Sequence, residues 1–284
     1  MTLDRDKLFS LFKYAIYALL TLNVYLFFAE EWAAAAYRFE DGVALADIIQ
    51  GFAASIDTAA WVVLLLMFEV ETVLTDERLG RRTRLALHAL RALCYLVIVY
   101  AFYGYLSKLL FLFAAAPLPD VQDLCRLVGG DWVYTVDLDE YAPLTAANCA
   151  QFSSAGTFYQ LQGLNAAVDP AGLSAITRLA WVDVINSGVW LIVVFLLEFD
   201  VRLQEKDRLE GFALRASTAA KYVLYSILLL AAIYWGVMGD FVDFWDAFLW
   251  LVAFFFIEMN VVEWRQESEA EVPAGAHSTG DSFI

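Results

Sequence analysis

Histidine and proline are scarce in this sequence, and each shortage excludes a class of function. Only two histidines occur in 284 residues, which is too few for a histidine-based metal site or for the histidine that a serine nucleophile needs. None of the five prolines falls inside a predicted helix, which disfavours a transporter built on helices broken at the membrane midplane. We therefore expect a protein that is not an enzyme and that binds no metal or cofactor.

Charged residues are also few, at 18% of the chain, whereas 61% of the residues are hydrophobic. A soluble domain of this length could not bury so much apolar surface, so the composition indicates an integral membrane protein with the lipid bilayer as partner. Six apolar windows reach the roughly 20 residues that cross a bilayer. These windows predict transmembrane helices over about 10–29, 52–74, 87–114, 179–201, 219–238 and 243–263.

The basic residues predict the orientation of these helices. With the N-terminus in the cytoplasm, fourteen of the 18 Lys and Arg residues fall on the cytoplasmic side and four on the other. Cytoplasmic loops of membrane proteins carry such an excess of positive charge, so both termini are predicted to be cytoplasmic, in the cell or inner membrane. The net charge of -16 argues against a nucleic-acid partner.

The chain divides into three parts by composition. Residues 1–264 are predicted as the six-helix membrane domain, and residues 265–284 as a disordered, acidic cytoplasmic tail. The long segment between the third and fourth helices, residues 116–177, is predicted as a small extracytoplasmic cap. The sequence does not determine the secondary structure of this cap, although the Asp169-Pro170 step resembles a turn near its end.

Two of the three cysteines, Cys125 and Cys149, lie in the predicted cap. In an oxidising compartment such a pair forms a disulfide, with two free thiols as the alternative. We expect the disulfide to staple the cap.

A polar pattern recurs in the apolar helices. Its three copies are Asp57-x3-Trp61-x7-Glu69, Asn186-x3-Trp190-x7-Glu198 and Asp246-x3-Trp250-x7-Glu258. The helix before each copy carries a basic residue and a tyrosine four positions apart: Lys13 and Tyr17, Arg91 and Tyr95, Lys221 and Tyr225. A repeated pattern implies a repeated unit, so the predicted fold is all-α, with three repeated helix hairpins and the cap inserted between helices 3 and 4.

Helical geometry places the repeated side chains at separate depths. The tryptophans fall near mid-span, and the glutamates lie nearer the cytoplasm, level with the three basic residues. We therefore predict ion pairs of Lys13, Arg91 and Lys221 with Glu69, Glu198 and Glu258. The acids of the first and third copies form an outer level, where Lys108 and Asp183 are also expected.

Two functions fit this pattern. Charges inside a transmembrane helix favour a functional site, so the leading hypothesis is a small-cation or proton channel or sensor. Its ion path would use Asp57, Asp246, Asn186, Glu69, Glu198 and Glu258, with a constriction at Trp61, Trp190 and Trp250. The alternative is a non-conducting structural or accessory subunit, whose ion pairs lock the bundle and whose outer cap binds a protein partner.

Overall fold

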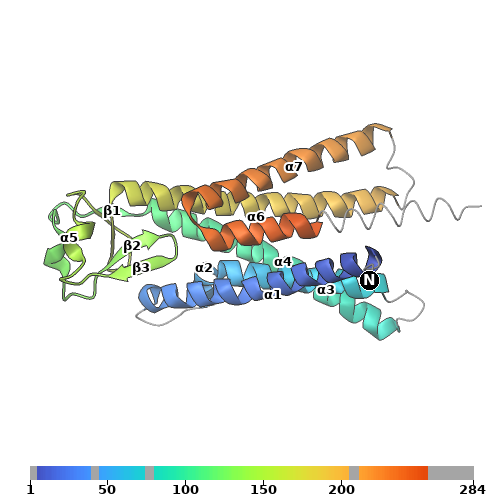
Figure 1. Cartoon of the computed structure of the whole chain (residues 1–284), viewed down its shortest axis with the longest axis horizontal. Coiled ribbons are helices and arrows are strands. Elements are labelled where there is room, and N and C mark those ends of the chain that lie inside the picture. Colours follow the sequence, from blue (N-terminus) through green and yellow to red (C-terminus); the bar gives the residue numbers. More distant parts are fainter. Residues whose placement is uncertain (1–4, 40–44, 74–79, 205–210, 255–284) are drawn as a thin grey trace, which may run out of the picture.

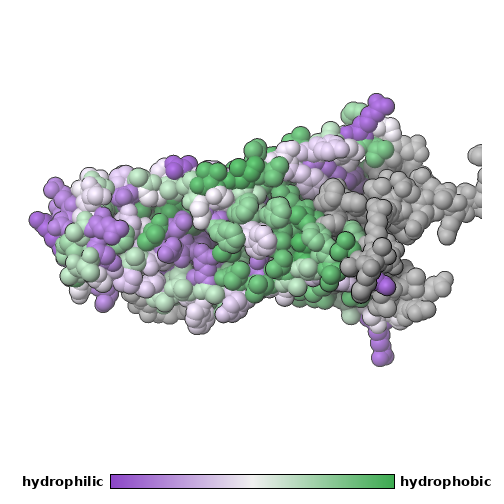
Figure 2. All heavy atoms as spheres, in the orientation of Figure 1, coloured by the Kyte–Doolittle hydropathy of each residue, from purple (hydrophilic) through white to green (hydrophobic). Residues whose placement is uncertain are grey.

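The structure is a computed structural model that describes residues 5–39, 45–73, 80–204 and 211–254. Long helices run side by side along the molecule, and a small unit that contains a sheet covers one end, called the cap end below (Figure 1). Figure 2 shows hydrophilic residues gathered on this cap and hydrophobic residues over the middle of the helices. This division is what a bilayer around the helices requires.

Within the described residues, the bundle contains five long helices. They are α1 (Arg5–Arg38), α3 (Ala53–Val73), α4 (Arg81–Phe113), α6 (Pro170–Gln204) and α7 (Gly211–Met238). Each of these five is long and apolar enough to cross a membrane, which confirms the mostly helical fold and fits an integral membrane protein. A short helix α2 (Leu45–Gly51) precedes α3, and residues 241–254 are helical as well. The second half of the predicted sixth span lies outside the described residues, and so does the predicted tail.

Helix α6 corrects one prediction, because it begins at Pro170 and not near residue 179. The Asp169-Pro170 step is the start of a helix and not a turn. Oδ1 of Asp169 accepts a hydrogen bond from the Gly172 backbone N–H at 2.6 Å, which satisfies one of the donors that the first helical turn leaves free. Proline fits the first helical position because that position needs no N–H. The predicted cap is shortened accordingly.

A buried glutamate joins α1 to the start of α3. Oε1 of Glu31 accepts a hydrogen bond from the Ala54 N–H at 2.8 Å. Oε2 accepts two more, from the Ser55 N–H at 3.1 Å and the Ser55 hydroxyl at 2.5 Å. A carboxylate at a helix N-terminus satisfies free donors and is favoured by the helix dipole. Glu31 is only 2% exposed, so it fixes where α1 crosses α3.

The cap is built on a five-stranded sheet, which the sequence did not predict. Its strands are β1 (Ala116–Pro117), β2 (Val133–Asp137), β3 (Glu140–Pro143), β4 (Tyr159–Gln160) and β5 (Ala166–Val168). They lie in the order β1-β4-β5-β2-β3. Strands β2 and β3 form an antiparallel hairpin, and β2 pairs with β5 in parallel. The turn of the β2–β3 hairpin points toward the helices (Figure 1).

A disulfide links Cys125 to Cys149, as predicted, with 4.9 Å between the two Cα atoms. Cys125 lies in the short 3-10 helix η2 (Leu124–Leu127), and Cys149 begins the helix α5 (Cys149–Phe152). Beside it, Leu124 and Phe158 belong to a small hydrophobic core. The cap therefore has its own core and covalent staple, and it also rests on the helices through polar contacts described below.

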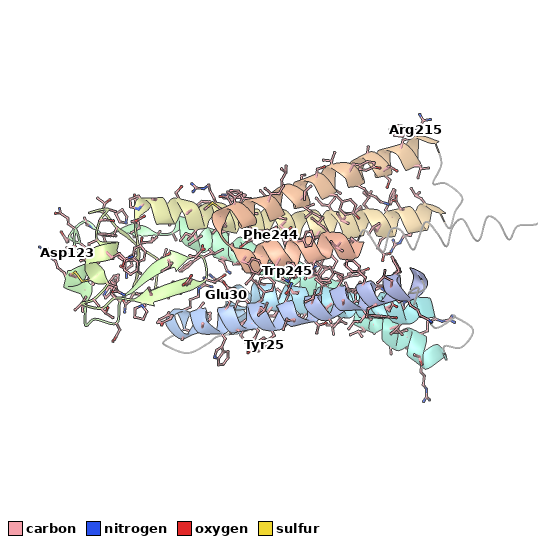
Figure 3. All side chains as sticks on the ribbon, viewed as in Figure 1. Tyr25, Glu30, Asp123, Arg215, Phe244 and Trp245 are labelled. Carbon is pink, nitrogen blue, oxygen red and sulfur yellow. A yellow bond between two sulfur atoms is a disulfide. The ribbon has the colours of Figure 1, made fainter. Side chains whose placement is uncertain are left out.

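Aromatic side chains are exposed on the helices near the cap end. Trp32 of α1, Phe113 of α4 and Trp181 of α6 are all exposed. In Figure 3, Tyr25 points away from the bundle in the same region. Tryptophan and tyrosine gather at the headgroup level of membranes, so this band supports a membrane–water interface close to the cap.

Candidate functional site

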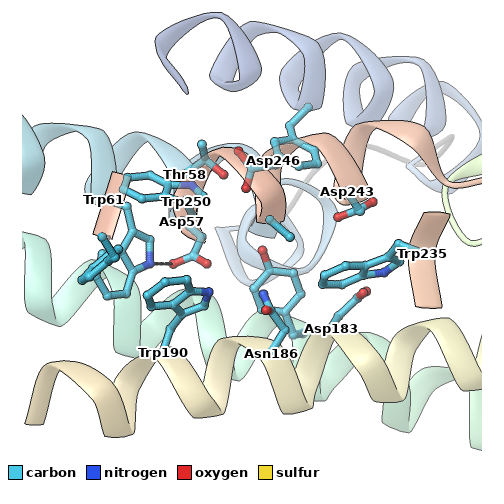
Figure 4. Close-up of a pocket in the computed structure, with 14 residues that line it drawn as sticks. Asp57, Thr58, Trp61, Asp183, Asn186, Trp190, Trp235, Asp243, Asp246 and Trp250 are labelled. Carbon is cyan, nitrogen blue, oxygen red and sulfur yellow. Dashed lines mark hydrogen bonds between the residues drawn. The ribbon is translucent and has the colours of Figure 1, made fainter. Parts of the chain in front are cut away.

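A cavity of about 40 Å³ lies among the helices toward the cap end (Figure 4). We call it the acid cavity. Four of its wall residues are aspartates, and none of the described residues that line it is basic. Its polar wall residues are Asp57 and Thr58 from α3, Tyr105 from α4, Asp183 and Asn186 from α6, and Asp243 and Asp246 from helix 241–254. Four buried carboxylates without a basic partner are unfavourable unless protons neutralise some of them or a cation compensates their charge.

Two of these aspartates are held by neutral donors. Oδ1 of Asp57 accepts a hydrogen bond of 3.1 Å from Nε1 of Trp61, one turn later on the same helix face. Oδ1 of Asp246 accepts one of 2.8 Å from Nδ2 of Asn23, which is fully buried on α1. These contacts orient the carboxylates. They supply no positive charge.

The three repeated tryptophans meet on the side of the acid cavity away from the cap. The ring centroid of Trp61 lies 5.9 Å from that of Trp190 and 6.1 Å from that of Trp250. Phe254 completes the group, 4.5 Å from Trp190. We call these four residues the aromatic plug. All four are buried, and all four line this side of the acid cavity.

A second cavity of about 160 Å³, the vestibule, lies between the β2–β3 hairpin and the helices. It shares Phe27, Tyr105, Asp183 and Asp243 with the acid cavity, so the two spaces adjoin. Its wall is also acidic, with Lys108 as the one basic residue among the described lining residues. Its further acidic wall residues are Glu30, Glu31, Asp137, Asp139, Glu140 and Asp240.

The cap is fastened to the vestibule rim by one carboxylate and two cations, called the clamp. Asp139, in the β2–β3 turn, accepts from Nζ of Lys108 on α4 at 2.8 Å and from Nη2 of Arg38 on α1 at 2.8 Å. Arg38 also donates to the Tyr141 hydroxyl at 3.0 Å. Burial alone would raise the pKa of Asp139, but the charges and hydrogen bonds of Lys108 and Arg38 outweigh it, so that pKa is lowered. Burial raises the pKa of Asp137, which lacks these partners.

At the end of the bundle opposite the cap, Lys13 and Glu69 form one of the predicted ion pairs. Nζ of Lys13 lies 2.6 Å from Oε1 of Glu69. The hydroxyl groups of Tyr14 and Tyr17 donate to the same carboxylate at 3.0 and 3.4 Å. Glu69 therefore sits in a satisfied network.

The second copy of the pattern also has a tyrosine on its glutamate. Glu198 accepts a hydrogen bond of 2.9 Å from the Tyr95 hydroxyl, and Arg91 acts electrostatically on that tyrosine. Nζ of Lys221 lies 3.0 Å from Oδ2 of Asp200. Glu258, its predicted partner, lies outside the described residues.

The predicted ion path is thus divided by the aromatic plug. Asp57, Asp246 and Asn186 line the acid cavity on the cap side. Glu69 lies beyond the plug, about 18 Å from Asp57 along α3 at 1.5 Å per residue. The acids of the cavity lie beside aromatic rings from α3, α6 and helix 241–254.

Some residues of the site carried a weaker signal in the sequence. Asp183 was placed at the outer depth without a role, although it stands one turn from Asn186 on the same helix. Asp243 and Asp240 look like solvated residues of a short link between helices, and only the fold turns them toward a cavity. Asn23 is a lone amide in an apolar helix, and its partner is 223 residues away.

Comparison with known proteins adds no relative: no family model, no curated protein and no solved structure matches this chain.

Proposed function

We propose that this chain is a multi-span membrane protein that admits a small cation or a proton into the acid cavity and passes or senses it. The observation that carries the proposal is the charge of that cavity. Four aspartates line it and no basic residue does in the described part. Buried carboxylates without a partner destabilise a fold, and in membrane proteins such groups usually serve a path or a sensor.

The proposed topology has six spans and three repeated helix hairpins, with both termini in the cytoplasm and the cap outside. Three tryptophans from three separate helices converge at one depth, which supports the repeat. The charge distribution along the sequence supports the orientation. In this orientation the vestibule faces the outside and the Lys13–Glu69 level faces the cytoplasm, so the acid cavity is loaded from the outer side. No catalytic role is proposed.

The second function is a structural or accessory subunit, and the closed plug favours it. Trp190 and Phe254 are in close ring contact, and ion pairs lock the bundle at both of its ends. Such a protein would use its cap to bind a protein partner. It would gain little from Asp57 and Asp246, because neither has a basic partner among the described residues.

Flux through purified protein in proteoliposomes distinguishes the two functions. We expect the wild-type chain to carry or exchange H⁺, Na⁺ or K⁺, and the Asp57→Asn/Asp246→Asn double variant to lose that activity. Asparagine keeps the acceptor for Trp61 and Asn23 and removes only the charge, so the variant is expected to fold. The absence of any flux in the wild type would favour the accessory subunit. Full flux in a folded double variant would remove these acids from the mechanism.

A further inference from the structure

We propose that the species held in the acid cavity is a proton, carried by water and shared among the aspartates, and not a metal cation. This inference rests on the proposed function and names its ion. It starts from two polar atoms on the cavity wall that need different partners. Oδ1 of Asn186 is a buried acceptor without a hydrogen-bond partner in the described structure, and Nε1 of Trp235 is a buried donor without one.

Trp235 matters because it is 2% exposed and lines the cavity. In Figure 4 it stands between Asp183 and Asp243. Its Nε1 interacts with Asp183 without reaching hydrogen-bond geometry. A buried N–H left without an acceptor is unfavourable, so we expect a group in the cavity to accept a hydrogen bond from it.

A water molecule can satisfy both the Trp235 N–H and the Asn186 oxygen, whereas a metal ion can satisfy only the oxygen. A water molecule can accept from Trp235 and donate to Asn186 or to a carboxylate. A metal ion attracts acceptors only, and it would leave the Trp235 N–H unsatisfied. The cavity of about 40 Å³ has room for about three waters, at 10–15 Å³ of this volume for each.

The arrangement of the acids points the same way. Metal ions in proteins are bound by several oxygens that converge on one point. In the residues that the structure describes, no group of three or more Asp, Glu, His or Cys side chains is placed to hold a metal ion. Aspartates spread along a hydrated cavity, with no basic residue among them, suit proton exchange instead.

The charged and titratable groups around this water come from every packed element. Asp57 belongs to α3, Asp183 to α6, and Asp243 and Asp246 to helix 241–254, while Tyr105 lies opposite on α4. Toward the vestibule the nearest groups are Glu30 and Glu31 on α1, Lys108 on α4, Asp240 in the link after α7, and Asp139 on the cap. Lys108 is engaged by Asp139 and also acts electrostatically on Asp183, but it is a single positive charge beside four aspartates.

Infrared spectroscopy of the protein in lipid tests this assignment, because a protonated carboxyl has its own carbonyl-stretch band. At neutral pH we expect the wild type to show the band, and Asp57→Asn/Asp246→Asn to lose part of it. Asp131→Asn is the matched control, since Asp131 is an exposed acid on the cap, and its band should equal that of the wild type. Adding Na⁺ or K⁺ should leave the wild-type band unchanged.

Three results would overturn the proposal: no band in the wild type, a band displaced by Na⁺ or K⁺, or an unchanged band in a folded double variant. If the double variant does not fold, adding Na⁺ or K⁺ to the wild type still distinguishes a bound proton from a bound metal cation. The experiments distinguish an error in the identity of the ion from an error in the proposed function. Na⁺ or K⁺ flux without the band contradicts the proton and keeps the path, whereas no flux of any ion contradicts the path itself.

Discussion

Replacing Asp139 with asparagine is expected to lower the free energy of unfolding by about 3–5 kcal/mol, because it leaves two buried cations without their anion. Lys108 is 2% exposed and its side chain meets Asp139 on both carboxylate oxygens. Arg38 loses its only carboxylate partner among the described residues. The measurement is chemical or thermal unfolding in detergent, with hydrogen exchange of the β2–β3 hairpin reporting on release of the cap.

The control for this variant is Glu140→Gln, which removes an exposed acid from the same hairpin. It should change stability by less than about 0.5 kcal/mol. The clamp also predicts a pH dependence. The pKa of Asp139 is lowered in the folded protein. Its contribution to the free energy of unfolding is therefore fully present above the unfolded-state pKa of about 3.9, and it is lost as the pH falls through the lower folded-state pKa. An Asp139→Asn variant as stable as Glu140→Gln would contradict the clamp.

Replacing Trp190 with alanine is expected to open the aromatic plug and to raise proton leak through proteoliposomes above that of the wild type. The side chain is 7% exposed and contacts both Trp61 and Phe254. Its removal joins the acid cavity to new space on the far side and destabilises the protein by about 3–5 kcal/mol. The measurement is vesicle pH under an imposed potential, with the folded fraction determined by size-exclusion chromatography.

Trp181→Ala is the matched control for the plug, since it removes an exposed tryptophan from the same helix. We expect its leak to equal that of the wild type. Trp190→Phe keeps an aromatic ring and should leak less than Trp190→Ala. A folded Trp190→Ala protein without added leak would mean that the plug is not the barrier.

The sequence predicts the helical part of the fold well because hydrocarbon-length apolar runs have few alternative structures. The spacing shared by three apolar segments singles out Trp61, Trp190 and Trp250, and the ring of Trp61 lies close to those of the other two in the structure. The disulfide was predictable because Cys125 and Cys149 share the one long loop.

The remaining features depend on contacts between distant segments, which a local pattern does not contain. In the clamp, Asp139 binds Lys108, which is 31 positions away along the chain, and Arg38, which is 101 positions away. The sheet of the cap is formed by strands of two to five residues, too short for an alternation to be recognised. Lys221 binds Asp200, which lies two residues after Glu198 and outside the pattern found in the sequence.

If Asp57 and Asp246 serve ion handling, as proposed, they are not needed to hold the bundle together. The most direct test is the melting temperature of Asp57→Asn/Asp246→Asn against wild type at neutral pH in the same lipid. Asparagine resembles a protonated aspartate in shape and neutral charge, and it keeps the acceptor that Trp61 and Asn23 use. We expect a melting temperature equal to or above that of the wild type, since buried carboxylates without a basic partner are unfavourable. A fall of several degrees would contradict it, because the two acids would then be stabilising the fold.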